Sequence, residues 1–446
     1  MTQDALWLLV VNALFLLGGL GVTSAAGLRR ELHRRLGVSY LAGVAAYGVI
    51  AQTLFVLGVR MTRVEIVVVC LVLALGLARQ RPSLRRLRIG VPGTAVVAVV
   101  VLLVVLAVDL WYQPLWAYDA WTFWTPKAHA LAALGLQPAW FAQPELLNRD
   151  YPLLLPSVEA AGFRFTGYET GLLDLQSWLF VVALLGAFAE LVVARAPRWA
   201  VALPTLIVVS PSIADQLAAA EADIPLAAFF ACAAAFAYLW HVEGDRSSLL
   251  LFGLFCAGTA ATKAEGLGFV VALALVFAVA DARRRPRAAL ALVGTAALAV
   301  LAALGAWREW VDAHHIPQQA SIGRVTDLSL LAHRLERPPI AAAYLAARLL
   351  DPRAWLVLVP LLAVLTCLLA RRSRGDAVLV AGFVLLSLAT LVLAYWTSQF
   401  QLHYHLETSA RRVITGPLLA WAFLVPLAWG RLRADPAADP ATLSTT

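Results

Sequence analysis

The sequence predicts an all-α, polytopic transmembrane bundle of about thirteen helices. Of its 446 residues, 61% are hydrophobic and only 14% are charged, and the mean hydropathy is +0.79. Soluble globular chains are far less apolar. Several apolar runs exceed the roughly 18 residues that a helix needs to cross the hydrocarbon core. Because lipid cannot satisfy open backbone groups, these spanning segments are expected to be helices.

The first four apolar runs carry the chain from the outside of the membrane back to its outer face. They cover about 5–22, 37–59, 64–79 and 91–110. Arg29–Arg35 follows the first run and Arg79–Arg88 follows the third. The positive-inside rule places both basic blocks in the cytoplasm, so the N-terminus is expected outside.

A long outer segment follows, from 111 to about 170. It holds an amphipathic piece, Pro126–Leu134, with its proline near the helix start. The later stretch Asn148–Pro156 has prolines placed where a regular helix cannot accommodate them. We therefore expect a half-buried surface loop there.

Nine further apolar runs complete the expected bundle. They cover about 171–194, 199–213, 225–241, 249–262, 267–281, 288–306, 354–370, 376–395 and 413–429. Basic blocks after alternate runs again mark the cytoplasmic side: Arg195–Arg198, Arg283–Arg287, Arg371–Arg374 and Arg431–Arg433. A second outer segment, 307 to about 353, is expected to hold two surface helices broken at Pro338 and Pro339.

The chain divides into three expected parts. Residues 1–90 form an N-terminal three-helix transmembrane segment, 91–433 form a transmembrane core, and 434–446 form a disordered cytoplasmic tail rich in Pro, Ala, Asp and Thr. No convincing internal repeat is visible, and this weakens a transporter interpretation, since many transporters consist of two related halves.

Charge and cysteine usage argue against nucleic-acid binding and against a cysteine metal site. The net charge of +8 does not indicate nucleic-acid binding, because the arginines cluster in short loops where they orient helices. The four cysteines lie inside expected spans without metal-like spacing, so we interpret them as core residues. They are Cys70, Cys232, Cys256 and Cys367.

The chain is organised around Trp116–Lys127, which comes directly after the fourth apolar run. An ionisable Asp119 beside four large aromatic residues at a membrane edge is costly to desolvate and is usually functional. Asp119 is therefore the predicted working residue. Two alternatives stay open: Asp119 caps a surface helix or pairs with Lys127, or Asp109 is the functional acid.

Five charged clusters are expected to converge on the outer face. They are Asp119 with Lys127, Asp150 with Tyr151, Glu221 with Asp223, Lys263 with Glu265, and His405 with Arg411 and Arg412. Acids that accept a proton and cations that hold an anion are what group transfer from a phosphate-linked donor requires. The pattern predicts transferase chemistry beside the bilayer.

Five short motifs carry a family resemblance, and they occur in a fixed order. They are YDAWTFWTPKA from Tyr118, RDYPLLLP from Arg149, EADIPLA from Glu221, TKAEG from Thr262 and HLETSARR from His405. In this order they resemble the bacterial integral-membrane glycosyltransferases of the GT-C superfamily, in particular its family-39-like group. The resemblance covers about 118–420 of this chain.

The resemblance implies a GT-C type fold with extracytoplasmic loop helices in the bacterial plasma membrane. It implies transfer of a sugar, mannose- or arabinofuranose-like, from a polyprenyl-phosphate donor to a hydroxyl of an envelope glycan, glycolipid or protein, with inversion. Asp119 would be the general base. Lys263, Arg411 and Arg412 would be candidates to hold the donor phosphate, because fixed cations stabilise its growing charge.

The remaining nominated residues would bind the donor or line the site. They are Tyr118, Trp121, Lys127, Asp150, Tyr151, Glu221, Asp223, Glu265 and His405. Two motifs depart from the family pattern: Tyr118 stands where the family often has Trp, and Asn148-Arg149-Asp150 stands where it often has His-Pro-Asp. The three spans before the fourth also exceed the single span usual in the superfamily.

Each nominated group also has a purely structural interpretation. The aromatic residues around Asp119 fit an interfacial belt or a surface that stacks on a sugar ring. Glu221 and Asp223 fit a helix start, where acids favour the dipole. Lys263 and Glu265 fit an interfacial salt bridge, whereas Arg411 and Arg412 run against the positive-inside trend and indicate a bound anion.

No metal cofactor is expected. His314, His315, His403 and His405 lack the spacing of a zinc site, although a metal bridging Asp119 and Asp223 is conceivable because some superfamily members use one. The rival function is a transporter or flippase of a lipid-linked saccharide, for which we would expect charges at mid-membrane and paired broken helices. A non-catalytic envelope-assembly protein is the third possibility.

Overall fold

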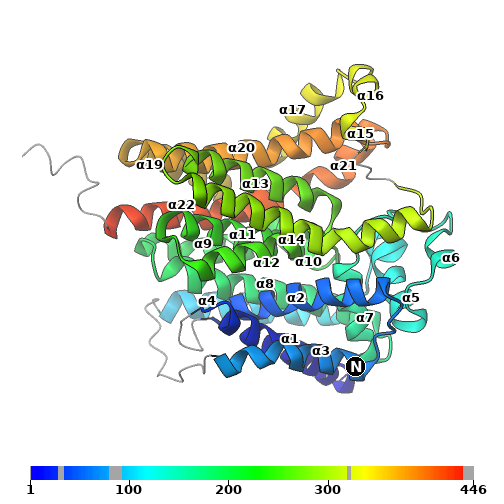
Figure 1. Ribbon diagram of the computed structural model, residues 1–446. Coiled ribbons are helices and arrows are strands. Elements are labelled where there is room, and N and C mark those ends of the chain that lie inside the picture. The colour runs from blue at the N-terminus through cyan, green and yellow to red at the C-terminus, as the bar shows by residue number, and fades with distance from the viewer. Residues whose placement is uncertain (1, 29–34, 80–92, 319–322, 435–446) are drawn as a thin grey trace, which may run out of the picture.

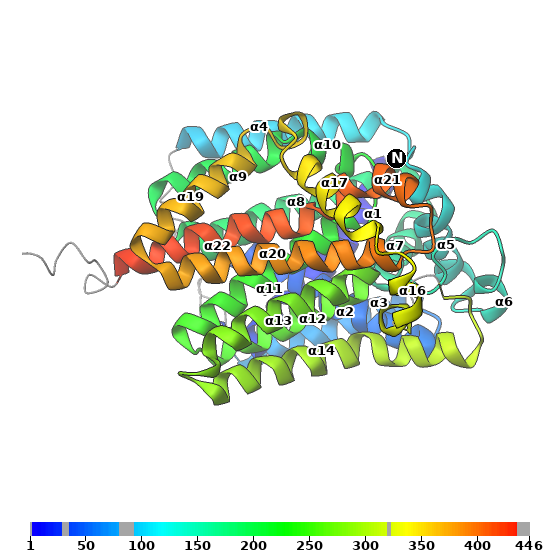
Figure 2. The same ribbon diagram turned by 90° about the horizontal axis from the view of Figure 1, so that it is seen from above.

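The computed structural model describes residues 2–28, 35–79, 93–318 and 323–434. Within these ranges the regular structure is entirely helical. The long helices lie side by side as an elongated bundle, and shorter helices gather at one end of it (Figures 1 and 2). An all-α architecture is therefore confirmed.

The bounds of the helices in the first half of the chain are as follows: α1 Thr2–Ala25, α2 Leu36–Val56, α3 Arg63–Ala74, α4 Gly93–Tyr112, α5 Thr125–Leu134, α6 Pro138–Phe141, α7 Leu154–Thr166, α8 Leu173–Phe188, α9 Ala202–Val209, α10 Pro211–Leu217 and α11 Asp223–Glu243.

Those in the second half are α12 Arg246–Thr262, α13 Ala264–Ala282, α14 Pro286–Ala313, α15 Gly323–Thr326, α16 Leu328–Ala332, α17 Arg337–Leu349, α18 Pro352–Trp355, α19 Leu358–Arg372, α20 Arg374–Thr397, α21 Leu402–Val413 and α22 Thr415–Ala434.

Eight helical segments of the described chain are long and apolar enough to cross a membrane. They are Gln3–Ala25, Leu36–Val56, Thr170–Val193, Asp223–Glu243, Ala264–Ala282, Pro286–Ala313, Arg374–Thr397 and Leu402–Leu432. The pair α9 and α10, bent by 53°, would make a ninth. Shorter apolar helices occur at Val96–Tyr112, within α4, and at α12. A multi-pass membrane protein is thus supported, while the count of thirteen spans stays a prediction.

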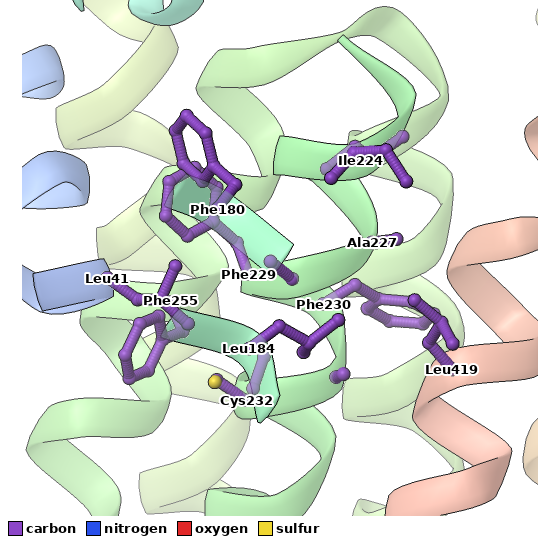
Figure 3. Packing of buried hydrophobic residues seen from close by; sticks show 14 of the residues in the cluster. Leu41, Phe180, Leu184, Ile224, Ala227, Phe229, Phe230, Cys232, Phe255 and Leu419 are labelled. Carbon is purple, nitrogen blue, oxygen red and sulfur yellow. The ribbon is translucent and has the colours of Figure 1, made fainter. Parts of the chain in front are cut away.

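The helix α11 occupies the centre of the bundle. Most of it is buried, 89% over its most apolar window, and its alanines let neighbouring helices approach closely. It packs against α12 and α22, and also against α8 and α13. Figure 3 shows Phe180, Phe229 and Phe255 on one side of α11, and Phe230 pointing towards Leu419 of α22 on the other.

The helices α1 and α2 cross at a glycine contact. A Cβ at Gly19 would lie 1.7 Å from the Ser39 carbonyl oxygen, and one at Gly43 would lie 1.9 Å from the Phe15 carbonyl oxygen. Only glycine allows this backbone approach. The helix α2 then packs against α7 and α8, and α1 also contacts α7. The first two helices therefore help to position the elements that support the candidate site.

The short helices lie at one end of the bundle. In Figures 1 and 2 α5, α6, α16 and α21 are at the right-hand end, where the described chain also begins, and α22 finishes at the opposite end. The helix α5 confirms that Pro126–Leu134 is helical, but Lys127, Ala128 and Leu131 are all buried. The helix α7 covers α5, so the lysine of the expected amphipathic piece does not face solvent.

The expected loop Asn148–Pro156 is shorter and more deeply buried than predicted. The helix α7 begins at Leu154, and Pro156 lies in its first turn, where a backbone N–H has no intrahelical acceptor and proline is tolerated. Asp150 is fully buried. Between α14 and α19, Pro338 and Pro339 lie in the first turn of α17 in the same way.

Three predictions lie outside the described residues. These are the cytoplasmic placement of most of Arg29–Arg35 and of Arg79–Arg88, and the disorder of the tail after residue 434.

Candidate functional site

Asp119 opens an irregular helical turn. It precedes a π-helical turn, Ala120–Trp124, that leads into α5; π-helical turns are frequent at functional sites. The Trp121 Nε1 donates to the Leu115 carbonyl oxygen at 2.6 Å, while the rings of Trp121 and Tyr118 are exposed. The two rings are thus free to contact lipid or a ligand beside Asp119.

Arg412 joins two acids from distant parts of the chain. Its Nη2 donates to Asp119 Oδ2 at 2.7 Å, and its Nη1 donates to Glu221 Oε2. The planar guanidinium fork suits two carboxylates at once. The alternative pairing of Asp119 with Lys127 is therefore wrong, and Asp119 and Glu221 belong to one cluster.

Lys263 forms a second ion-pair group. Its Nζ lies 2.9 Å from Asp223 Oδ1 and 3.7 Å from Glu265 Oε1. Lys263 has an extended backbone between α12 and α13, and this break turns its side chain towards the start of α11. Burial alone would lower the pKa of Lys263, but Asp223 and Glu265 raise it above its usual value.

Tyr151 lies among the acids of four motifs. Burial raises the pKa of its hydroxyl well above the usual value, and the negative charges of Glu265, Asp150, Asp119 and Asp223 raise it further. These electrostatic contributions require all four carboxylates to be near one phenol. Tyr151 therefore marks the point where the predicted clusters converge.

Lys127 lies in the wall of the site. It is fully buried, and its Nζ donates to the Asn148 carbonyl oxygen at 2.5 Å. The Nζ is also about 6 Å from the ring centroids of Phe123, Trp124 and Tyr151. Burial lowers its pKa to about 7, against the opposing charge of Asp150. The hydrogen bond from Lys127 to Asn148 therefore stabilises the turn that contains Tyr151.

Asp150 is fixed from the other side by α14. Its carboxylate Oδ2 lies 3.3 Å from Arg308 Nη1, and the Trp307 Nε1 donates to its backbone oxygen at 3.1 Å. Sequence reasoning missed both partners. The one available signal was the aromatic and charged stretch Trp307–Trp310 at the end of an apolar run.

Arg411 and His405 lie on α21 beside the ion pairs. Arg411 Nη2 is 3.1 Å from Asp215 Oδ2, and both side chains are exposed by a third or more, so this pair contributes little. The His405 ring lies 4.8 Å from Tyr395 and 5.3 Å from Phe400 between ring centroids, and its buried Nδ1 has no hydrogen-bond partner.

Asp109, the rival acid, lies elsewhere. It is exposed on the last turn of α4, where it accepts a hydrogen bond from Gln113 Nε2 at 2.9 Å. That contact is a local one within four residues. Of the two acids, Asp119 is the one in the charged cluster.

The cluster around Arg412 contains more carboxylates than cations. In the described part of the chain, Asp119, Glu221, Asp223 and Glu265 form ion pairs with two cations, Arg412 and Lys263. Burial raises the pKa of Glu221 to about 7; Arg412 lowers it, and Asp223 and Asp119 raise it. The cluster can therefore exchange a proton near neutral pH. Within the described residues, no three His, Cys, Asp or Glu side chains are grouped as metal ligands.

Comparison of the chain with protein-family models, with curated proteins and with solved structures gives no match.

Proposed function

We propose that the protein is a GT-C type membrane glycosyltransferase. It moves a mannose- or arabinofuranose-like sugar from a polyprenyl-phosphate donor to the hydroxyl of an envelope glycan, glycolipid or protein, with inversion. The observation that carries this proposal is the contact of Arg412 with both Asp119 and Glu221. These residues come from three motifs up to 293 residues apart, and they meet next to exposed aromatic rings.

Asp119 acts as the base in this proposal. Arg412 holds its Oδ2, and no hydrogen bond to Oδ1 occurs among the described residues, so Oδ1 can accept the hydrogen of the acceptor hydroxyl. The acceptor oxygen forms a bond to the anomeric carbon as the bond from that carbon to the phosphate oxygen breaks. The proton passes to Asp119, and the lipid phosphate leaves as the anion.

The acids that surround Arg412 and Lys263 change the expected role of both cations. Each is already neutralised by two carboxylates, and an added phosphate would meet the excess acids. In this proposal Arg412 and Lys263 position Asp119 and Asp223. Arg411, with its exposed partner Asp215, is freer to meet an anion.

The proposed membrane arrangement has about thirteen crossings, with the N-terminus and the site outside and the C-terminus in the cytoplasm of a bacterium. The described chain starts at the end of the bundle that carries the short helices and finishes at the other end (Figure 1). This supports an odd number of crossings. The arginine blocks that alternate along the sequence support the direction.

A transporter or flippase of lipid-linked saccharides is the second candidate. Two observations favour it: the bend of 53° between α9 and α10, and the buried acids Glu159 and Asp174, which have carboxylate oxygens without a hydrogen-bond partner. Broken helices and intramembrane acids are common in transporters. Inverted repeats would produce two broken helices at corresponding positions, whereas the described chain has one bent helix pair.

The deciding experiment is sugar transfer from radiolabelled polyprenyl-phosphate donors by the purified chain in lipid. Native protein is compared with Asp119→Asn, and Asp109→Asn, at the end of α4, serves as the matched acid outside the charged cluster. Transfer that fails only in Asp119→Asn supports the proposal. Equal rates in all three remove Asp119 as the base, and labelled lipid that crosses the bilayer without transfer favours the transporter.

A further inference from the structure

Three arginines converge on the C-terminal end of α20. Arg324 Nε donates to the Thr397 carbonyl oxygen at 2.8 Å. Arg334 Nη1 and Arg337 Nη1 both donate to the Ser398 carbonyl oxygen, at 2.5 and 2.8 Å. Three positive charges from α15 to α17 therefore meet at two neighbouring backbone oxygens.

These charges lack carboxylate partners. No ion pair to Arg324, Arg334 or Arg337 occurs among the described residues, whereas Arg308, Arg411 and Arg412 each face an acid. Burial lowers the pKa of Arg337; Arg334 and Arg324 lower it further, and the exposed Glu336 opposes them. The hydrogen bonds to two adjacent carbonyl oxygens hold the three guanidinium groups close together.

Capping of α20 explains only part of this arrangement. The carbonyl end of a helix carries about half a negative charge, which one arginine can balance. Each guanidinium has five N–H donors, and the carbonyl contacts use one donor of each. The remaining donors suit an ion with several acceptor oxygens, and phosphate is the common case.

Apolar side chains are exposed on the same segment. Leu328 is 79% exposed, Leu335 is 64% exposed and Ile340 is 37% exposed. The helices α16 and α17 lie at the periphery of the bundle, at the end that carries the short helices (Figures 1 and 2). Basic groups next to exposed apolar groups are typical of a surface that contacts the headgroup region of a membrane.

We propose that Arg324, Arg334 and Arg337 bind the phosphodiester headgroup of an anionic phospholipid, with Leu328 and Leu335 against its acyl chains. The contacts of these three arginines share no residue with the ion pairs of Arg412. This lipid site does not depend on the proposed sugar transfer, because its evidence is the charge and exposure of α15 to α17 alone.

The test measures lipid binding to the purified full chain in a neutral detergent by native mass spectrometry. Short-chain phosphatidylglycerol and phosphatidylcholine are compared, for the native chain and for a variant in which Arg324, Arg334 and Arg337 become Gln. Each arginine near a membrane surface contributes about a fivefold effect on affinity. We expect phosphatidylglycerol to bind preferentially, and the triple variant to lose roughly a hundredfold.

Two controls separate charge from folding. Arg353→Gln changes an exposed arginine of the neighbouring α18 and should leave binding unchanged. The triple Lys variant keeps the charges and should bind within about tenfold of the native chain, while thermal unfolding reports whether each variant is folded.

Several results would overturn the proposal. These are equal binding of the two phospholipids, unchanged binding in a folded triple Gln variant, and loss of binding in a folded triple Lys variant. Displacement of phosphatidylglycerol by millimolar inorganic phosphate would show a site for a free anion. Binding of polyprenyl phosphate but not phosphatidylglycerol would assign the arginines to a lipid-linked donor.

Discussion

Arg412 Nη2 lies 2.7 Å from Asp119 Oδ2, although 293 residues separate the two in the sequence. The same guanidinium also holds Glu221. The contact joins the turn before α5 to α21 and fixes the direction of the Asp119 carboxylate. Its orientation is therefore sensitive to the shape of the cation as well as to the charge.

Replacement of Arg412 by Lys tests this geometry. An ammonium group cannot present a planar fork to two carboxylates, so we expect transfer activity to fall by about 10²–10³-fold while donor binding changes less. Sugar-transfer kinetics with separate kcat and KM measure this. Arg195→Lys, whose ion-pair partner Glu243 is exposed, is the matched control, and its activity should fall by less than about threefold.

Removal of Lys263 should destabilise the fold. Lys263→Met leaves Asp223 buried without its cation, which costs about 3–5 kcal/mol. The double variant Lys263→Met with Asp223→Asn should recover more than half of that loss. Thermal unfolding in lipid measures both, and Arg195→Met, which breaks an exposed pair with Glu243, should cost less than about 1 kcal/mol. No recovery in the double variant would show that Lys263 acts through other contacts.

Composition and hydropathy were sufficient to predict the helical class and the gathering of charged motifs, because both follow from what lipid excludes. Each expected apolar run contains a helix, but not all of these helices meet the length that a span requires. The start of α7 was missed because proline was read as a helix breaker, although a first turn tolerates it.

The partners within the site could not be predicted. The order of apolar runs and basic blocks indicates which helix ends lie on the same side of the membrane, but it does not show which side chains form pairs. The pairing of Arg412 with both Asp119 and Glu221 was therefore not predicted. Asp215 and Arg308 were missed because neither lies in a motif. The arginines of α15 to α17 look like ordinary surface charges until the end of α20 is placed beside them.

Lys127 should make stability depend on pH in a defined direction. Its pKa falls to about 7 in the folded chain because of burial, against about 10.4 when unfolded. Between these values the unfolded state binds more protons, so stability rises with pH. Lys127→Met removes this dependence. Relative to native protein, its free energy of unfolding should fall by about 1.4 kcal/mol per pH unit from pH 7 to 9.

Chemical unfolding of both proteins at pH 6, 7, 8 and 9 measures that slope. Lys127→Met also removes the donor to the Asn148 oxygen, which shifts stability equally at every pH and leaves the slope unchanged. Parallel pH profiles for the two proteins would show that Lys127 keeps an ordinary pKa.

Glu159 should give a pH dependence of the opposite sign. It lies on α7, 4% exposed, with its Oε2 lacking a hydrogen-bond partner. Burial raises its pKa well above the usual value, and the neighbouring Asp174 raises it further. A raised carboxyl pKa gives stability that is complete below the unfolded pKa of about 4.3 and is lost as pH rises through the folded pKa. Glu159→Gln, which cannot ionise, should match native stability near pH 5 and exceed it increasingly towards pH 9.

Glu169→Gln, on the turn after α7, is the control. An equal gain in stability from both substitutions at pH 9 would show that the gain comes from removing any negative charge and not from the burial of Glu159.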